Sequence, residues 1–177
     1  RLRTHGITKD PNQMEENNDP WYYEMNEVGY NYRITDFQCA LGSSQIRKLD
    51  KFVQKRREIA KKYNEAFSNI ENLTIPVSNS AVYHAYHLYP LQIDFDNISV
   101  TKLELFEKMK ELGINLQVHY IPIHLQPFYK KNYGFNFGEY PISESFYKNE
   151  ISLPIYYDLS MDDVSLVADN ILKFISA

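Results

Sequence analysis

The sequence predicts an α+β protein in which a long amphipathic helix joins an N-terminal segment to a small two-layer α+β domain. Apolar residues recur at spacings of three and four between residues 36 and 67, which is typical of one helix face. Beyond residue 69 the pattern reads strand, helix, strand, strand, helix, which is typical of helices packed on a small sheet. We therefore expect one part over residues 1–68 and a second domain over residues 69–177.

The N-terminal part begins with an expected last turn of a helix that Gly6 ends. Residues 7–28 are polar and aromatic without a period, so they predict a loop. This loop contains three consecutive aromatic residues, Trp21, Tyr22 and Tyr23. Such a run needs a packing surface, either in a neighbouring element or in a partner chain.

A long helix is predicted from Asp36 to about Phe67, and Thr35 with Gln38 fits the capping box that starts a helix. Its length would be about 48 Å at 1.5 Å per residue, so we expect a kink or break near Gly42 or around Asp50. A helix of this length is expected to bridge two domains. Its apolar stripe consists of Phe37, Ala40, Leu41, Ile46, Leu49, Val53, Ala60, Tyr63 and Phe67.

The second domain begins after a connection over residues 69–80, and residues 86–94 alternate as a strand in which Pro90 indicates an edge or a bulge. Thr101 and Glu104 form a capping box for a helix that Gly113 ends. The remaining elements follow in order: a strand at 114–120, short helical turns near 126–131 and 143–147, a strand at 150–155, and a helix capped by Ser160.

Composition excludes several classes of protein. The chain has 177 residues, 44% of them hydrophobic, which suffices for a packed core. A net charge of -4 argues against a nucleic-acid-binding protein, and no apolar run approaches the ~20 residues of a membrane span. Cys39 is the only cysteine, so we expect a reducing compartment, the cytoplasm, and a core position for this side chain. His119 and His124 lack acidic or cysteine neighbours at suitable spacing, so no metal site is expected.

Residues 29–45 are the most informative stretch, because polar groups directly precede the predicted helix. Gly29 permits an unusual backbone angle, Asn31 offers a donor and an acceptor, and Arg33 offers a fork of donors. A helix start beside such groups can bind an anion such as phosphate. The alternative is an ordinary helix cap with a surface ion pair.

A second candidate is Gln117-Val-His-Tyr, where a predicted strand ends before a proline. His119 either donates a hydrogen bond to a ligand or is a structural histidine, and the residues alone leave both open. No Ser-His-Asp, Walker or dinucleotide-binding motif occurs, and no lysine stands out as a buried amine. The sequence thus predicts binding groups without a catalytic centre.

Several motifs in order identify a resemblance to the DegT/DnrJ/EryC1/StrS sugar aminotransferases. They are Arg-Thr-His-Gly at 3–6, Gly-Tyr-Asn-Tyr-Arg at 29–33, the 36–45 segment, Lys-Arg-Arg-Glu-Ile-Ala at 55–60, His-Leu-Tyr at 87–89, Gln-Val-His-Tyr at 117–120 and Glu-Ile-Ser-Leu-Pro at 150–154. The resemblance implies the C-terminal part of an α/β enzyme of the aspartate aminotransferase fold. It also implies pyridoxal 5'-phosphate (PLP) as cofactor and a homodimer with composite active sites.

The resemblance further implies roles for individual residues. Asn31 would contact the cofactor phosphate or the substrate of the partner subunit, with Arg33 as a supporting contact. Residues 117–120, which are Gln117, Val118, His119 and Tyr120, would contact a nucleotide-sugar. The full-length enzyme would transfer an amino group from glutamate to a 4-keto-6-deoxy UDP-sugar.

The sequence departs from the family pattern in one respect. The Schiff-base lysine of the family lies in a Ser-x-His-x-x-Lys segment that this chain lacks, so we expect that lysine ahead of Arg1 and expect the chain alone to be inactive. Two alternatives stay open. One is a non-catalytic module for nucleotide-sugar binding or dimerisation, and the other is the same fold acting on a dTDP-keto-sugar.

Overall fold

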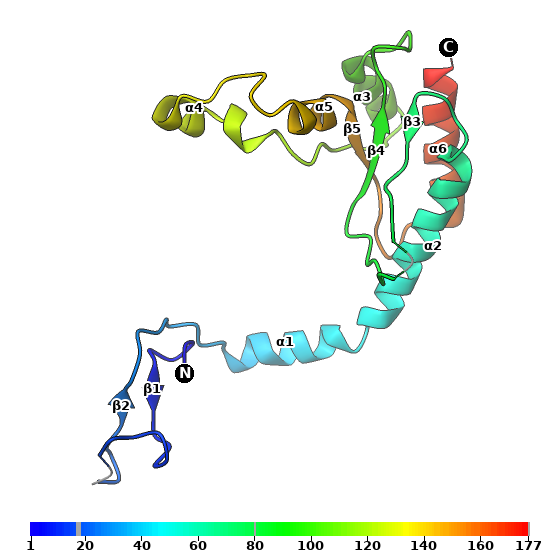
Figure 1. Ribbon diagram of the computed structural model, residues 1–177. Helices are drawn as coiled ribbons and strands as arrows, with labels where there is room; N and C mark the ends of the chain where they lie inside the picture. Colours follow the sequence, from blue (N-terminus) through cyan, green and yellow to red (C-terminus); the bar gives the residue numbers. More distant parts are fainter. Residues whose placement is uncertain (17–18, 80, 177) are drawn as a thin grey trace. The chain divides into compact units, whose positions relative to one another are not determined.

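The computed structural model describes residues 1–16, 19–79 and 81–176 (Figure 1). Contacts within the chain divide it into two units, Arg1–Leu49 and Asp50–Ala177, which are described separately. The predicted domain boundary after residue 68 falls at the end of a helix that packs within the second unit. That boundary stays a prediction about the whole protein. Residues 17, 18 and 80 of the predicted loops lie outside the described residues.

The first unit contains a small antiparallel pairing of strands β1 (Ile7–Thr8) and β2 (Glu24–Met25). Residues 1–6 form turns and a bridge from Thr4 to Asn31, so the predicted helix end at Gly6 is wrong. Gly6 instead lies in a turn, with a positive φ of 73°. Its own amide donates to Arg1 O. A left-handed glycine serves a tight turn as well as a helix end, and the sequence does not distinguish the two.

The structure explains glycine at position 29 differently from the sequence analysis. Its φ is not in the left-handed region, so the predicted unusual backbone angle is wrong. A Cβ at Gly29 would instead lie 2.2 Å from the backbone nitrogen of Gly6. The two backbones approach so closely that only glycine fits.

Replacing Gly29 with alanine is therefore expected to destabilise the first unit by about 1–3 kcal/mol, because the backbone must shift to admit the methyl group. Amide hydrogen exchange of residues 1–31 in the full-length protein would measure the loss as faster exchange. The matched control is Gly42→Ala, since a Cβ there meets nothing within 4 Å and alanine favours a helix. Equal exchange in both variants would contradict the close approach.

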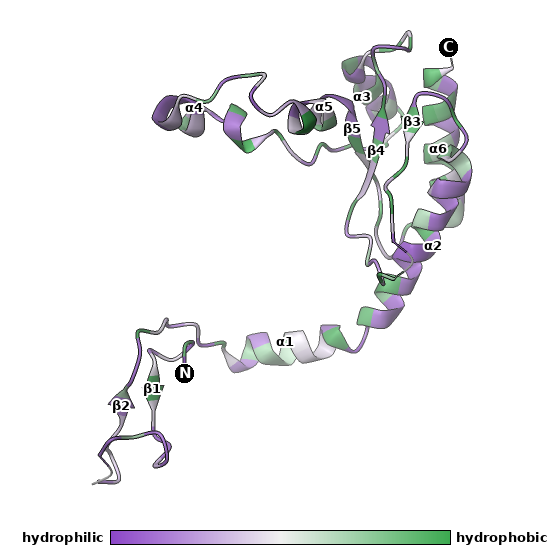
Figure 2. Cartoon of the chain, in the orientation of Figure 1, coloured by the Kyte–Doolittle hydropathy of each residue, from purple (hydrophilic) through white to green (hydrophobic). Residues whose placement is uncertain are grey.

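Helix α1 (Asp36–Ile46) begins with the predicted capping box, in which Thr35 accepts from the amide of Gln38 and the Gln38 side chain accepts from the amide of Thr35. A break at residues 47–48 separates it from α2 (Leu49–Phe67), which confirms the interruption predicted around Asp50. None of the residues of α1 is buried, and Cys39 is exposed, so the core position predicted for that cysteine is wrong for this chain. Figure 2, which is coloured by residue hydropathy, shows both hydrophobic and hydrophilic stretches along α1.

The second unit is built on the antiparallel sheet β3-β4-β5, formed by β3 (Leu73–Thr74), β4 (Tyr89–Ile93) and β5 (Glu150–Leu153). Leu91 pairs with Ile151 and Tyr89 with Leu153, so these side chains share one face of the sheet. That face forms one core with helices α2, α3 (Lys102–Glu111) and α6 (Met161–Ile175). The buried hydrophobic residues of these elements are Ile59, Ala60, Tyr63, Phe67, Tyr89, Leu91, Ile93, Leu105, Met109, Ile151, Leu153, Val164, Val167, Ala168 and Ile171.

Two strand predictions need correction. Residues 114–120 form only a bridge of Gln117 with Ser152 beside β5, not a full strand. β4 lies in the middle of the sheet although Pro90 suggested an edge. Because β3 pairs only with residues 92–93, the missing amide of Pro90 lies beyond the β3 pairing and costs no ladder hydrogen bond on that side.

An arm over residues 121–149 leaves the sheet and returns to it (Figure 1). It carries a 3-10 turn, η1 (Ile123–Leu125), and the helices α4 (Pro127–Tyr133) and α5 (Pro141–Asn149), where the sequence predicted two helical turns. Each of these two helices has proline in its first turn, where no amide donor is needed. Helix α5 leads directly into β5, so the arm is tied to the central sheet.

Candidate functional site

Asn31 lies in a segment whose backbone is held by the N-terminus of the first unit. The amide of Tyr32 donates to Arg3 O at 2.9 Å, and the amide of His5 donates to Tyr30 O at 2.9 Å. Tyr30 and Tyr32 stack with ring centroids 4.9 Å apart. Side chains alternate along an extended segment, so Asn31 points to the side opposite this pair. Asn31 is exposed on a fixed backbone.

The 117–120 segment is fixed to β5 by main-chain and side-chain bonds. Gln117 and Ser152 exchange backbone hydrogen bonds of 3.2 and 2.8 Å. The amide of His119 donates to Glu150 Oε2 at 2.9 Å, and His119 Nδ1 lies 2.8 Å from Ser152 Oγ. The segment is thus anchored at alternate residues, 117 and 119, which leaves Val118 half-buried and Tyr120 exposed.

Glu150 and Ser152 form the polar face of β5, because they alternate with the core residues Ile151 and Leu153. Ser152 Oγ donates to Glu150 Oε1, and both residues are buried. Lys102 lies close to Glu150 and donates from Nζ to Tyr147 O at 2.7 Å. Burial lowers the pKa of Lys102, and the carboxylate of Glu150 acts in the opposite direction.

A mainly apolar pocket of about 590 Å³ lies beside this segment. Tyr120 lines it together with residues 139–143 and Phe146 of the arm. A neighbouring pocket of about 350 Å³ shares Tyr140 and Ser143 with it. An apolar pocket with a few polar groups is the usual form of a small-molecule site. Tyr120 therefore joins the predicted binding residues to a cavity.

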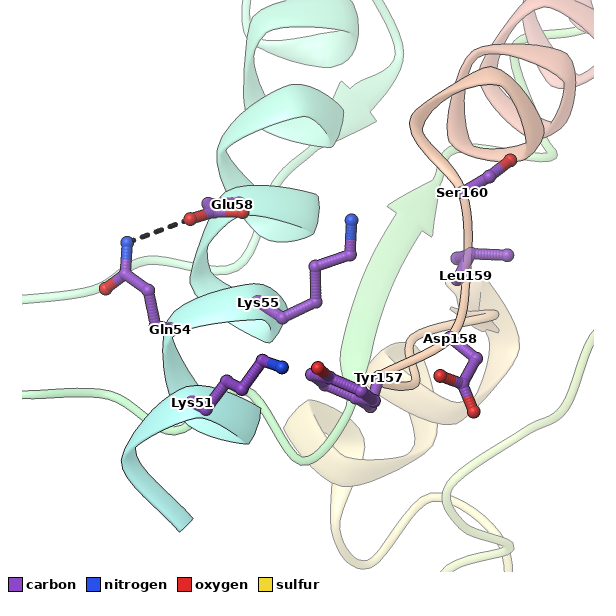
Figure 3. Close-up of a pocket in the computed structure, with 8 residues that line it drawn as sticks. All are labelled: Lys51, Gln54, Lys55, Glu58, Tyr157, Asp158, Leu159 and Ser160. Atoms are coloured by element: carbon purple, nitrogen blue, oxygen red, sulfur yellow. Dashed lines mark hydrogen bonds between the residues drawn. The ribbon is translucent and has the colours of Figure 1, made fainter. Parts of the chain in front are cut away.

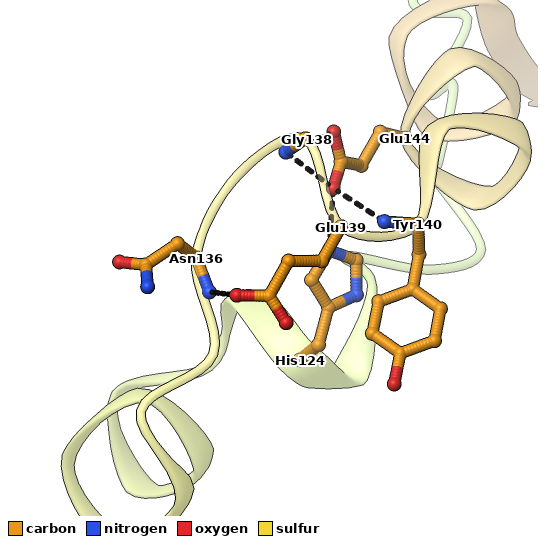
Figure 4. Close-up of polar contacts among 6 residues, drawn as sticks. All are labelled: His124, Asn136, Gly138, Glu139, Tyr140 and Glu144. Carbon is orange, nitrogen blue, oxygen red and sulfur yellow. Dashed lines mark hydrogen bonds and ion pairs between the residues drawn. The ribbon is translucent and has the colours of Figure 1, made fainter.

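A buried hydrogen bond between His124 and Glu144 helps to fix the loop from Gly138 to Tyr140, which adjoins these pockets (Figure 4). His124 Nε2 lies 2.7 Å from Glu144 Oε1, and Glu144 also accepts from the amides of Gly138 and Tyr140. Burial acts to raise the pKa of Glu144, but the bonds from His124, Gly138 and Tyr140 outweigh it and lower the pKa. His124 thus has a structural role in holding this loop.

The lowered pKa of Glu144 predicts a loss of stability in acid. Its carboxylate stabilises the fold at pH values above the ordinary glutamate pKa of 4.5, and this contribution is lost as the pH falls through the lower folded-state value. The melting temperature of the protein should therefore exceed that of Glu144→Gln above about pH 5, with the gap closing towards pH 3. Glu139→Gln is the control, because it changes a nearby exposed carboxylate. A gap that widens in acid would contradict this assignment.

Another pocket, of about 450 Å³, lies between α2 and the 157–160 loop (Figure 3). Lys51, Lys55 and Tyr157 line it, and Lys51 Nζ lies 5.3 Å from the centroid of the Tyr157 ring. The hydrogen bond with Tyr157 raises the pKa of Lys51. A raised pKa keeps this amine protonated, so Lys51 is not suited to act as a nucleophile.

The predicted site residues fall into two sets. Asn31 and Arg33 are exposed in the first unit, while Gln117, Val118 and His119 join Tyr120 in the second unit. Sequence reasoning missed Glu150 and Ser152 as neighbours of His119. The polar positions 150 and 152 in an otherwise apolar strand were the available signal.

The described residues contain neither a candidate metal-binding cluster nor a candidate membrane-spanning helix. No group of three or more His, Cys, Asp or Glu residues capable of holding a metal ion was found among them. Within the same described ranges, none of the helices is both long and apolar enough to cross a membrane.

Comparison with known proteins gives consistent matches. Residues 1–172 match the DegT/DnrJ/EryC1/StrS aminotransferase family. The chain is 42% identical to the uncharacterized protein MJ1066 of Methanocaldococcus jannaschii, over 99% of the chain and 45% of that protein. It is 35% identical to the UDP-4-amino-4,6-dideoxy-N-acetyl-β-L-altrosamine transaminase of Campylobacter jejuni, over 98% of the chain and 43% of that enzyme.

Solved structures support the same fold. Helicobacter pylori PseC, an aminotransferase involved in the biosynthesis of pseudoaminic acid, superposes with a TM-score of 0.78 at 30% identity, over 99% of the chain and 44% of PseC. The PLP form of the putative sugar aminotransferase Spr1654 from Streptococcus pneumoniae gives a TM-score of 0.75 at 25% identity, over 99% of the chain and 41% of that structure. The chain thus has part of the aminotransferase fold and spans less than half the length of these relatives. It belongs to the DegT/DnrJ/EryC1/StrS aminotransferase family, whose members use PLP.

Proposed function

We propose that this chain is the C-terminal part of a PLP-dependent aminotransferase that transfers an amino group from glutamate to a 4-keto-6-deoxy UDP-sugar. The observation that carries the proposal is the match of residues 1–172 to one aminotransferase family. The identity of 35% to an enzyme named as a UDP-sugar transaminase favours a UDP-linked substrate. We propose the cytoplasm as the compartment, because Cys39, the one cysteine of this chain, is an exposed thiol.

The anchored 117–120 segment is proposed to contact the nucleotide-sugar. Its backbone is fixed to β5, which reduces the entropy lost when a ligand binds. Exposed Gln117 offers an amide, and Tyr120 offers an aromatic wall and a hydroxyl beside the 590 Å³ pocket. Val118 and His119 complete the contact surface.

We propose that Asn31 donates to the phosphate group of PLP or contacts the substrate, with Arg33 as a supporting substrate contact. The Asn31 amide is exposed on a segment that backbone bonds hold in place, and the Arg33 guanidinium is exposed two residues further on. When bound, PLP supplies the electron sink for amino-group transfer. We propose that these donors serve the site of a partner subunit, so that a homodimer holds composite active sites.

The Schiff-base lysine is proposed to lie outside this chain. Lys51 keeps a raised pKa through its contact with Tyr157. Lys102 is half-buried, but its ammonium donates to Tyr147 O and lies 5.2 Å from the centroid of the Tyr147 ring. The chain also lacks the Ser-x-His-x-x-Lys segment of the family, so we expect the chain alone to be inactive.

Exposed apolar residues support the proposed dimer. In the first unit, Phe37 of α1 is 80% exposed and Ile46 is 69% exposed, and Trp21 of the loop is 72% exposed. Large apolar side chains at such exposure indicate a surface that another chain or domain covers. The mass of the full-length protein in solution would test the homodimer by light scattering.

Amination assays of the full-length protein would test the substrate proposal. We expect glutamate-dependent amination of a UDP-linked 4-keto-6-deoxy sugar, with the dTDP-linked sugar converted less well. Preference for the dTDP-sugar would contradict the proposed substrate and show that the same fold acts on a dTDP-linked keto-sugar. Tight UDP-sugar binding without amination would indicate the non-catalytic module instead.

Asn31→Ala in the full-length protein is expected to weaken binding of PLP or of the UDP-sugar by about 1–3 kcal/mol, the scale of a lost hydrogen bond to a charged group. Equilibrium dialysis of both ligands measures the change. The control is Asn12→Ala, which removes another exposed asparagine of the first unit that bonds to Asp10. Unchanged affinity for both ligands would remove Asn31 from the site.

A further inference from the structure

His119 takes part in a chain of hydrogen bonds that ends at a buried carboxylate. His119 Nδ1 lies 2.8 Å from Ser152 Oγ, and the Ser152 hydroxyl donates to Glu150 Oε1. The other oxygen of Glu150 accepts from the backbone amide of His119 at 2.9 Å. One carboxylate therefore holds the histidine twice, through its backbone directly and through its ring by way of Ser152.

The direction of each bond follows from the number of protons available. A serine hydroxyl carries one hydrogen, and in this chain that hydrogen goes to Glu150. Ser152 Oγ can then only accept from the imidazole, so Nδ1 of His119 must carry a hydrogen. In the neutral ring the other nitrogen, Nε2, is left with a lone pair.

The charge state of Glu150 is consistent with this direction. Both of its oxygens accept hydrogen bonds, which is the behaviour of an ionised carboxylate. The carboxylate of Glu150 acts to raise the pKa of Lys102, as a negative charge does. A protonated Glu150 would instead place a donor against the Ser152 hydroxyl or the His119 amide.

We propose that Glu150 and Ser152 are positioning residues that hold His119 as its Nδ1–H tautomer, so that Nε2 accepts a hydrogen bond from an N–H or O–H group of the nucleotide-sugar. This inference rests on the proposed function of the 117–120 segment. The sequence alone allows His119 as a hydrogen-bond donor to the ligand. In this proposal, Nε2 of His119 is instead a hydrogen-bond acceptor.

The proposed tautomer determines which groups of the ligand can contact Nε2. A sugar hydroxyl or the N–H of the base can donate to it. A phosphate or keto oxygen offers only lone pairs and is repelled by the lone pair of Nε2. His119 thereby helps to select the orientation of the ligand. A hydroxyl group or the edge of the base lies against its ring, and a phosphate does not.

The tautomer can be tested in the full-length PLP-bound protein labelled with 15N-histidine, with His119 assigned by comparison with His119→Gln. The 15N chemical shifts of the two ring nitrogens are expected to show hydrogen on Nδ1. Ser152→Ala should shift His119 towards the Nε2–H form, while Ser152→Thr, which keeps the hydroxyl, should retain Nδ1–H. Hydrogen on Nε2 in the unmodified protein, or shifts unaffected by Ser152→Ala, would overturn the proposal.

Binding measurements provide the second readout. Ser152→Ala is expected to weaken binding of UDP-N-acetylglucosamine by about three- to tenfold, the scale of one hydrogen bond. Ser152→Thr should bind as the unmodified protein does, and Ser145→Ala, an exposed serine of α5, is the matched control. UDP alone distinguishes the source of the donor, because a loss seen with UDP points to the base or ribose, and a loss confined to the UDP-sugar points to a sugar hydroxyl.

The two readouts separate the inference from the proposed function. If the unmodified protein binds neither UDP nor the UDP-sugar, the proposed function fails, and the ring shifts still decide whether Glu150 and Ser152 set the tautomer. If it binds both ligands and Ser152→Ala binds them equally well, the inference fails while the proposed function stands.

Discussion

Replacing Tyr63 with alanine is expected to destabilise the second unit by about 3–5 kcal/mol, the range for removing a fully buried aromatic side chain. Tyr63 on α2 has no exposed surface, and its ring lies 4.9 Å from that of Tyr89 on β4. Its hydroxyl donates to Pro154 O at 3.0 Å, directly after β5. The side chain thus joins α2 to two strands, and urea denaturation of the full-length protein would measure its contribution.

Two variants separate the ring from the hydroxyl. Tyr63→Phe keeps the ring and loses only the bond to Pro154 O, so about 1 kcal/mol is expected. Tyr156→Ala removes a tyrosine that is 50% exposed, and a small change is expected there. If Tyr63→Ala and Tyr156→Ala had equal effects, the packing of α2 on the sheet would be contradicted.

Replacing Glu150 with alanine is expected to cost about 3 kcal/mol, the upper end of the range for leaving buried donors without an acceptor. The change removes the acceptor of the Ser152 hydroxyl and of the His119 amide. It also removes the negative charge that acts to raise the pKa of the half-buried Lys102. Denaturation in urea, followed by circular dichroism, would measure the loss.

Glu150→Gln is the matched variant, because it keeps the shape and one acceptor oxygen but removes the charge. We expect about 1–2 kcal/mol for it, the cost of a mismatched buried hydrogen bond. A Glu150→Ala variant as stable as the unmodified protein would show that this carboxylate does not hold the 117–120 segment.

The helices could be predicted from the sequence because their signals are local. Thr35 and Thr101 each form the expected capping box, and Ser160 caps α6 as expected. Gly113 ends α3 with a positive φ of 77°. These interactions join residues no more than a few positions apart, so spacing alone identifies them.

The pairings between distant segments could not be predicted in the same way. β1, β2 and β3 have two residues each, too few to show an alternating pattern. The reason for glycine at position 29 is its contact with Gly6, 23 residues earlier in the chain. The exposure of α1 was also missed, because an apolar stripe predicts burial without naming what covers it.

The candidate site was predictable only in part. The proposed binding residues Asn31 and His119 belong to motifs that the sequence displays directly. The positions of Glu150 and Ser152 beside His119 depend on the register of β5 with the 117–120 segment, which lies more than 30 residues away. Register of this kind is set by the packing of the sheet, not by the local sequence.

We propose that this chain supplies binding groups to a PLP enzyme whose Schiff-base lysine lies elsewhere in the protein. The most direct test is borohydride reduction of the full-length protein with PLP bound, followed by peptide mass spectrometry of the modified lysine. We predict one stoichiometric adduct on a lysine outside residues 1–177. A stoichiometric adduct on a lysine of this chain, such as the half-buried Lys102, would contradict the claim.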